Sequence, residues 1–293
     1  MAKKKRTSNG LSYLIIIAFI LGGYLFITLP SKGQHQEPIS DSVKSELTVE
    51  FIDVGQGDSI LIMTPNKKTI LIDAGESGNY EKIKDTLYKY NINKIDAVIA
   101  THPHADHIGG MEQIIRNFEI GKIYMPDKIH TSKTFENLLL AIEEKGLEID
   151  IAEAGVKMDL DEALNLTFVS PNGDFADLNN TSAVLRLIYK DTSFLFTGDM
   201  EAKAEKLIDA NIDVDVLKVG HHGSDTSSSK EFLDKASPQI AVISVGKDNK
   251  YNHPSSEVIK RLNNIGAKIL RTDESGNITI TSDGVNLDIK TER

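Results

Sequence analysis

Cysteine is absent from this 293-residue sequence. The absence excludes disulfides, thiolate nucleophiles and cysteine-based zinc sites, so a metal ion must be bound by histidine and carboxylate side chains. Basic residues are also in the minority, because 33 Lys and Arg stand against 43 Asp and Glu, for a formal net charge of −10. Affinity for nucleic-acid phosphates comes largely from Lys and Arg, so this balance argues against a general nucleic-acid-binding protein. It leaves room for a locally basic rim around an active site.

A long uncharged run lies close to the N-terminus. Residues 11–29 contain no charge and follow four basic residues at positions 3–6. A helix of about 20 apolar residues crosses the hydrocarbon core, so the run predicts a transmembrane anchor. Residues 1–10 are expected to stay cytoplasmic, which places the rest of the chain outside the cell membrane. The alternative is a cleaved signal peptide and a secreted protein, but no A-x-A-like cleavage site follows Leu29.

The remainder of the chain divides into a linker and one folded domain. Residues 30–46 are rich in Ser, Gln and Pro and predict a flexible linker. Residues 47–293 alternate short apolar runs with helical patterns, which favours a mixed α/β (α+β) fold of two sheets covered by helices. The expected strands are 47–54, 59–63, 69–72, 97–100, 164–169, 183–189, 193–197, 214–219, 240–245, 268–270, 277–281 and 285–289. The expected helices are 80–90, 110–117, 134–145, 201–210, 230–236 and 255–264.

The densest group of metal-ligand residue types is the run HPHADH at 102–107. Residues two apart in an extended segment point the same way, so His102 and His104 can hold one metal ion. Asp106 and His107 follow as the chain turns and can serve a second ion nearby. A solvated histidine-rich loop is the alternative, but the position after an apolar strand and before two glycines favours metal binding. The donor set suits Zn²⁺, Mn²⁺ or Fe²⁺.

Further candidates lie in the second half of the chain. Asp199 follows an apolar strand, where it is either a metal ligand or a simple turn residue. His221 and His222 are neighbours, and successive strand residues point oppositely, so only one of them is expected to bind metal. We expect His221 to be the ligand and His222 to face the substrate or a structural partner. His253 either begins a helix or serves as a proton donor or phosphate contact.

Several of these segments resemble one known family. The run THPHADHIGG at 101–110 is similar to the signature of the metallo-β-lactamase superfamily. Further matching segments are FIDVGQGD at 51–58, LIDAG at 71–75, FTGD at 196–199, KVGHHGS at 218–224 and NHP at 252–254. Together they most resemble the metallo-hydrolase domain of the ComEC/Rec2 competence proteins over residues 47–293. The resemblance implies an αββα sandwich with a metal site at one edge, here preceded by one N-terminal transmembrane helix.

The resemblance also implies how the site is built. It implies that one pair of histidines binds a first metal ion and that a set of histidine and aspartate side chains binds a second. Asp199 is expected to bridge the two ions. Asp73 is expected to orient a ligand histidine without touching metal. The implied ligands are His102 and His104 for the first ion, and Asp106, His107 and His221 for the second.

One ligand of the family is missing. A typical member has a further histidine on the first metal ion, whereas residues 179–182 read NNTS. We expect two divalent ions, Zn or Mn, with a weak first site that the amide oxygen of Asn180 or a water completes. Asp106, Asp199, His222, His253 and Asn180 are the residues expected to take part in catalysis.

The predicted activity is that of an extracytoplasmic metal-dependent hydrolase. A two-metal site suits phosphodiesters, and the resemblance to competence proteins points to DNA as a substrate. An esterase, a lactonase or a hydrolase of phosphoesters in the cell envelope would use the same site. A catalytically weak, metal-bound domain for binding or assembly is the alternative of a different class, and loss of folding on metal removal without turnover would favour it.

Overall fold

The structure is a computed structural model that describes residues 46–293. The predicted cytoplasmic segment, the predicted anchor helix and all but the last residue of the predicted linker lie outside this range. Within it, no helix has both the length and the apolar character needed to cross a membrane.

The larger sheet carries the first strands of the domain and also the last two. Its order is β14-β13-β1-β2-β3-β4-β5-β6. The strands are β1 (Leu47–Phe51), β2 (Ile60–Met63), β3 (Thr69–Ile72), β4 (Lys94–Ile99), β5 (Glu119–Met125), β6 (Ile149–Ile151), β13 (Ile278–Ser282) and β14 (Leu287–Thr291). Pairs from β3 to β6 are parallel and the others are antiparallel. The chain therefore returns at its end to pair β13 with β1.

The smaller sheet is formed by the middle of the chain. Its order is β12-β11-β10-β9-β8-β7. The strands are β7 (Asn165–Ser170), β8 (Val184–Tyr189), β9 (Thr192–Phe196), β10 (Val216–Lys218), β11 (Ile240–Ile243) and β12 (Lys268–Arg271). Strands β9 to β12 run parallel, so their carboxyl ends lie at one edge of the sheet.

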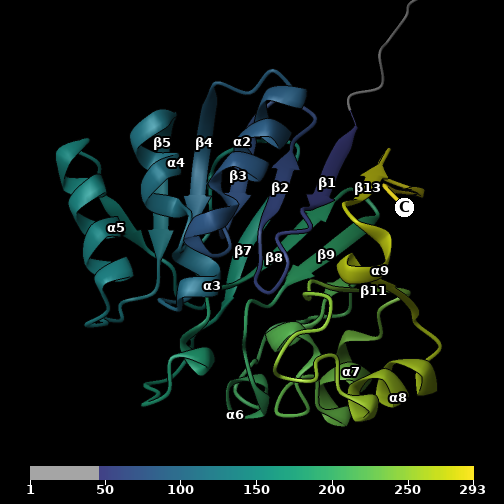
Figure 1. The fold of residues 1–293 in the computed structure, drawn as a ribbon. Coiled ribbons are helices and arrows are strands. Elements are labelled where there is room, and N and C mark those ends of the chain that lie inside the picture. Colours follow the sequence, from purple (N-terminus) through teal and green to yellow (C-terminus); the bar gives the residue numbers. More distant parts are fainter. Residues whose placement is uncertain (1–45) are drawn as a thin grey trace, which may run out of the picture. The chain divides into compact units, whose positions relative to one another are not determined.

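Helices cover the outer face of each sheet and leave the two inner faces packed together (Figure 1). The larger sheet is covered by α2 (Tyr80–Lys89), α3 (Ala105–Ile108), α4 (Met111–Asn117) and α5 (Lys133–Glu144). The smaller sheet is covered by α6 (Ala202–Glu205), α7 (Lys230–Ala236) and α8 (Ser256–Asn264). This is the αββα sandwich that the sequence predicted.

Alternation along buried strands explains the layers. In β9, Phe194 and Phe196 pack between the sheets, whereas Leu195 packs under the helices of the smaller sheet. Successive strand residues point to opposite faces, so a strand buried on both sides must be apolar throughout. Three of the covering helices are capped by serines, Ser132, Ser229 and Ser255, whose side chains accept a hydrogen bond from the third following backbone N–H.

Some elements differ from the sequence-based expectation. Strands β5 and β6 and the short α9 (Thr272–Ser275) were not predicted, and the helix expected over 201–210 is only the single turn α6. Strand β5 begins with exposed polar residues around Gly121, which conceal its apolar second half. The short 3₁₀ turns η1 (Ser77–Asn79), η2 (Asn179–Thr181) and η3 (Gly220–Gly223) lie in loops.

Candidate metal centre

The candidate residues meet where the loops that follow parallel strands emerge from the two sheets. Asp73 follows β3 and His102 follows the adjacent parallel strand β4. Asp199 follows β9, and His222 follows the adjacent parallel strand β10. Carboxyl ends of parallel strands share an edge, so each sheet brings its polar residues together, and the sandwich brings the two sets face to face.

Short turns orient the side chains of the histidine motif at 102–107. His104 has extended backbone dihedrals and directly precedes helix α3, which carries Asp106 and His107. The loop between β1 and β2 packs against this helix at Gly57, where an added Cβ would lie 2.2 Å from the carbonyl oxygen of Asp106. This contact places Asp58 beside His107, with 3.8 Å between Asp58 Oδ2 and His107 Nδ1.

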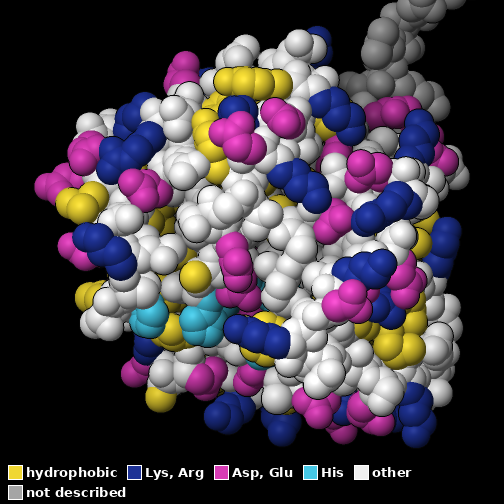
Figure 2. Space-filling model, in the orientation of Figure 1, with side chains coloured by type: hydrophobic (Ala, Val, Ile, Leu, Met, Phe, Trp, Pro, Cys, Tyr) yellow, Lys and Arg dark blue, Asp and Glu magenta, His cyan; other side chains and the backbone are white. Residues whose placement is uncertain are grey.

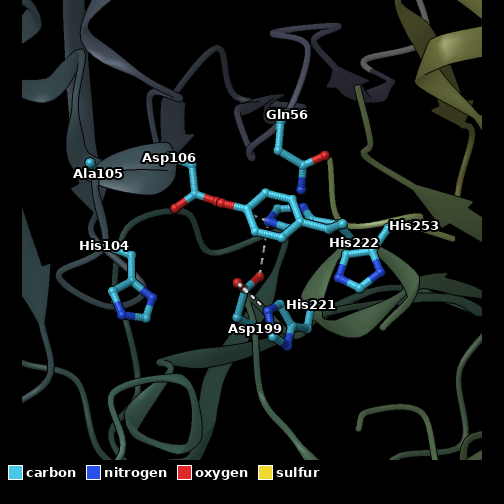
Figure 3. Close-up of a pocket in the computed structure, with 9 residues that line it drawn as sticks. Gln56, His104, Ala105, Asp106, Asp199, His221, His222 and His253 are labelled. Carbon is cyan, nitrogen blue, oxygen red and sulfur yellow. Dashed lines mark ion pairs between the residues drawn. The ribbon is translucent and has the colours of Figure 1, made fainter. Parts of the chain in front are cut away.

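Four side chains form a compact set, here called the four-donor group: Asp106, His107, Asp199 and His222. Asp199 Oδ1 lies 3.2 Å from His107 Nε2 and 3.5 Å from His222 Nε2. His222 Nε2 also lies 3.4 Å from Asp106 Oδ2. Figure 3 shows Asp106, Asp199 and His222 converging on one cavity.

A second set, the three-donor group, shares Asp199 and adds His102 and His104. His102 Nε2 lies 2.9 Å from His104 Nδ1 and 3.7 Å from Asp199 Oδ2. Asp199 thus turns one carboxylate oxygen toward each group. Burial, followed by the nearby His107, holds the pKa of His102 well below its ordinary value, which favours a neutral imidazole.

The four-donor group fits a divalent cation. Asp199 Oδ1, His107 Nε2 and His222 Nε2 are buried and have no hydrogen bond of acceptable geometry with any described residue, although they face one another. Buried polar atoms normally have a partner, and converging donor atoms are satisfied by a metal ion. Ligands about 2.0–2.1 Å from a tetrahedral metal stand roughly 3.3 Å apart, close to the observed spacing.

Asp73 supports His107 from behind. Its Oδ2 accepts hydrogen bonds from His107 Nδ1 at 2.8 Å and from the Thr101 hydroxyl at 2.6 Å. Proton placement on Nδ1 leaves Nε2 of His107 free to face the four-donor group. Although burial opposes a charged ring, Asp199 and Asp73 raise the pKa of His107 well above its ordinary value.

A buried ion pair lies beneath His222. Lys218 contacts the carboxylate of Asp58, and both side chains are almost fully buried. His222 Nδ1 donates to the carbonyl oxygen of Ser244 at 3.0 Å and lies 3.4 Å from Asp58 Oδ1. Burial opposes ionisation of Asp58, but Lys218 and then His222 lower its pKa. Although burial lowers the pKa of His222, Asp199 and the other nearby carboxylates raise it to about 9.

The two neighbouring histidines occupy the opposite positions from those expected. His222 belongs to the four-donor group, whereas His221 belongs to neither group. Both have left-handed backbones, with φ of 48° and 53°, so the alternation of an extended strand does not apply. His221 Nδ1 instead lies 3.0 Å from Glu201 Oε1, and its hydrogen bond lowers the pKa of Glu201 to about 2.

The donor groups open into a cavity of about 310 Å³. Figure 2 shows histidine side chains exposed on this face, with a basic side chain beside them. The residues that line the cavity are Gln56, His104, Ala105, Asp106, Asp199, His221, His222, Tyr251 and His253. His253 therefore faces the space beside the donor groups, and burial lowers its pKa.

A model of the metallo-β-lactamase superfamily matches residues 52–247 of this chain. The chain belongs to this superfamily. It is a metal-dependent hydrolase with the metallo-β-lactamase fold, and its two sheets, covering helices and histidine motif are those of the family that the sequence resembled.

Curated relatives within the superfamily include competence proteins. The chain is 33% identical over 257 residues to ComE operon protein 3 of Bacillus subtilis, covering 80% of this chain and 33% of that protein. It is 31% identical over 242 residues to competence protein ComA of Neisseria gonorrhoeae, covering 80% of this chain and 32% of that protein. The predicted similarity to ComEC/Rec2 proteins is confirmed, and the chain spans about a third of the length of these relatives.

A shorter relative carries an enzyme name. The chain is 29% identical over 180 residues to exodeoxyribonuclease WalJ of Streptococcus pneumoniae serotype 2 strain D39. That match covers 57% of this chain and 62% of the relative.

The side-chain amide of Asn180, which was expected to complete the first metal site, forms hydrogen bonds within the fold. Its Nδ2 donates to Asp177 Oδ1 at 2.6 Å, and its Oδ1 accepts from the backbone N–H of Ala204 at 3.0 Å. The buried amide therefore connects turn η2 to helix α6. We assign Asn180 to the support of this loop, and not to the first metal site.

Three polar residues that support the histidines of the metal centre were not predicted from the sequence. Asp58 and Lys218 stand in segments that resemble the family but received no role of their own, and Glu201 received no assignment. A lysine within the apolar run VLKVG at 216–220 was a usable signal, because a buried ammonium group requires a charged partner. The identity of that partner, 160 positions away in the sequence, was not predictable from spacing.

Proposed function

We propose that this chain is a two-metal phosphodiesterase that acts on DNA. The observation that carries the proposal is the position of Asp199 between two donor groups, with Oδ1 facing His107 and His222 and Oδ2 facing His102. Two adjacent cation sites joined by one carboxylate suit the in-line displacement at a phosphodiester.

The metal sites follow from the donor groups. Asp106, His107, Asp199 and His222 would hold one ion, and His102, His104 and Asp199 would hold the other. Divalent cations such as Zn²⁺ or Mn²⁺ supply a nucleophile at neutral pH and stabilise negative charge on the phosphorus oxygens. The three-donor group has one protein ligand fewer, so we expect it to bind its ion more weakly than the four-donor group.

Residues of the chain position the substrate. His253 and His221 face the cavity and can donate hydrogen bonds to phosphate oxygens. Glu201 fixes the ring of His221 through Nδ1, which directs Nε2 toward the cavity and Asp199. Asp73 and the Asp58–Lys218 pair hold His107 and His222 in place.

DNA is the substrate we favour because of two kinds of relative. One relative is named an exodeoxyribonuclease and two are competence proteins. The acidic net charge of −10 implies modest affinity for long nucleic acids, with binding concentrated at the site itself.

We also propose an extracytoplasmic location, with residues 11–29 as a membrane anchor. Protease added outside intact spheroplasts that express the full chain should digest residues 47–293 and leave a cytoplasmic marker intact. Protection of the domain until the membrane is lysed would contradict this orientation.

Hydrolysis of bis-p-nitrophenyl phosphate by the full chain, purified in detergent and loaded with Mn²⁺ or Zn²⁺, tests the proposed activity. We expect metal-dependent turnover that falls at least about 100-fold in Asp199→Ala, because this change removes a ligand from both sites. Asp213→Ala, at an exposed aspartate away from the cavity, is the matched control and should retain turnover.

Absence of turnover in a folded, metal-loaded chain would overturn the proposal. Esters, lactones and phosphorylated envelope polymers would then be the next substrates, because the same donor groups serve them. A chain that loses its fold on metal removal and hydrolyses none of these would instead be a metal-bound binding domain.

A further inference from the structure

Tyr251 is an exposed aromatic residue at the rim of the metal cavity. It is 51% exposed and lines the cavity together with His253. The two rings are stacked, with centroids 5.8 Å apart and an interplanar angle of 19°. Figure 3 shows His253 on the same cavity wall as His221 and His222. A flat π-surface therefore stands directly beside the donor groups.

The loop that presents this ring is fixed by one side chain. Asn249 Oδ1 accepts hydrogen bonds from the backbone N–H groups of Tyr251 at 3.1 Å and His253 at 3.0 Å. Its Nδ2 donates to the carbonyl oxygens of Gly246 at 2.9 Å and His253 at 2.7 Å. An aromatic ring on a loop held in this way loses little conformational freedom when a ligand stacks on it.

One lysine lies close to the ring, and a second belongs to the same loop. Lys250 Nζ is 5.0 Å from the centroid of Tyr251, and Lys247 lines the surface hollows that continue from Gln56 and His253. Neither lysine forms an ion pair with a carboxylate in the described part of the chain. The nearby acid Asp273 is already paired with Arg271. Asp248 stands between the two lysines and also has no ion pair among the described residues, so this loop carries two positive charges against one negative, although the chain as a whole is acidic.

Two further basic residues of the same hollows share one carboxylate. Arg293 is paired with Asp53 at 2.9 Å, and Lys82 lies 3.7 Å from the same carboxylate. The lysines of this region that have no ion pair among the described residues are therefore Lys247 and Lys250, in the loop that carries Tyr251.

We propose that Tyr251 is a stacking platform for one base of a single-stranded nucleic acid whose neighbouring phosphodiester enters the metal cavity. The proposal rests on the proposed function and specifies its substrate. Bases in a duplex stack on one another, so only an unpaired base can lie on an exposed ring. Lys247 and Lys250 would contact flanking phosphates, and the tyrosine would contribute affinity with little preference among bases.

The test compares two oligonucleotides of equal length, an oligothymidylate and an oligomer of abasic residues, both with hydrolysis-resistant phosphorothioate linkages. Fluorescence anisotropy gives their dissociation constants for the full chain. Wild type should bind the oligothymidylate about 5- to 150-fold more tightly, which corresponds to one base stacked on an aromatic ring. In Tyr251→Ala this ratio should fall toward one, while Tyr251→Phe should keep it.

Two further variants separate stacking from charge and from general surface effects. Tyr88→Ala removes a tyrosine of similar exposure, 53%, on helix α2, and should keep the ratio. The double variant Lys247→Gln/Lys250→Gln should raise both dissociation constants together and lower their salt dependence, because both oligomers carry the phosphate backbone.

A wild-type ratio of one, or an unchanged ratio in Tyr251→Ala, would overturn the platform. Because binding is measured without turnover, these outcomes are independent of the bis-p-nitrophenyl phosphate assay. Loss of the ratio in Tyr251→Ala together with no hydrolysis would retain the platform and reject the phosphodiesterase. Hydrolysis with no base-dependent binding would retain the phosphodiesterase and reject the platform.

Discussion

At the scale of single residues, Asp73 determines how well the site holds metal. In Asp73→Asn the amide can donate to His107 as well as accept from it, so the ring is no longer fixed with Nε2 facing the donor group. Loss of such a supporting carboxylate lowers metal affinity by about 10- to 100-fold. Competition with a chromophoric chelator measures this loss. Asp161→Asn, at another buried aspartate outside the site, should leave the affinity unchanged.

Glu205 gives a pH-dependent prediction away from the metal donors. Its carboxylate accepts backbone hydrogen bonds from Ser228 and Ser229, and burial raises its pKa above the ordinary value of 4.5. A folded-state pKa above the unfolded value means that the folded chain binds the proton more tightly. The contribution of Glu205 to the free energy of unfolding is therefore full below pH 4.5 and is lost as pH rises through the raised pKa.

Urea denaturation across this range should show the effect. Relative to Glu205→Gln, which cannot ionise, the wild-type free energy of unfolding should decline as pH rises above 4.5. Parallel pH profiles for the two proteins would contradict this, because they would show that Glu205 has the same pKa in the folded and the unfolded chain.

Residue identity could be predicted where neighbours in sequence are neighbours in space. The motif at 102–107 contributes all three of its histidines and Asp106 to the two donor groups, which Asp199 and His222 complete. The choice between His221 and His222 could not be predicted. Both residues have positive φ, so the direction of each side chain depends on the turn and not on the alternation of a strand. The contacts of Asn180 and the pairing of Asp58 with Lys218 depend on segments brought together only by the tertiary fold.

At the scale of elements, the loop between β1 and β2 holds helix α3 in place. Gly57 has φ of +129° and stands where a Cβ would clash with backbone, so Gly57→Ala must move the loop away from Asp106. Gly55→Ala is the matched control, since Gly55 also has positive φ, +71°, but has open space around it. We expect the change at Gly57 to cost roughly 1–3 kcal/mol more than the change at Gly55.

Thermal unfolding and metal titration of both variants measure this difference. Gly57→Ala should also weaken metal binding, because Asp106 belongs to the four-donor group. Equal behaviour of the two alanine variants would mean that the loop moves without disturbing α3.

Element type could be predicted where apolar periodicity is strong. Helices α2, α5, α7 and α8 were expected close to their observed bounds, as were most strands. Strand β6 was missed because it is three residues long and mostly exposed at the end of its sheet. Helix α6 was predicted to be too long, because the sequence after Glu205 continues an apolar pattern typical of a helix although the backbone there is not helical.

At the scale of the whole molecule, an ion in the four-donor group would join the two sheets. His102, His104 and His107 follow strands of the larger sheet, whereas Asp199 and His222 follow strands of the smaller one. A cation bound at 100 times its dissociation constant stabilises the folded state by about 2.7 kcal/mol. Chelation should therefore lower the melting temperature by roughly 5–10 °C.

Differential scanning fluorimetry with and without chelator tests this expectation. Re-addition of Mn²⁺ or Zn²⁺ should restore the melting temperature of the wild type, and restore that of Asp199→Ala much less. An identical response of the two proteins would place the stabilising ion elsewhere.

The shared carboxylate of Asp199 also has a kinetic meaning. An ion held by both His107 and Asp199 would close a loop of roughly ninety residues, which includes the five strands β5 to β9 and the connection between the sheets. Such a reversible cross-link is released only when the ion leaves, so the lifetime of the folded domain should lengthen as free metal rises. If the domain lies outside the cytoplasm, as we propose, the ambient concentration of the ion would then set how long each copy of the enzyme survives.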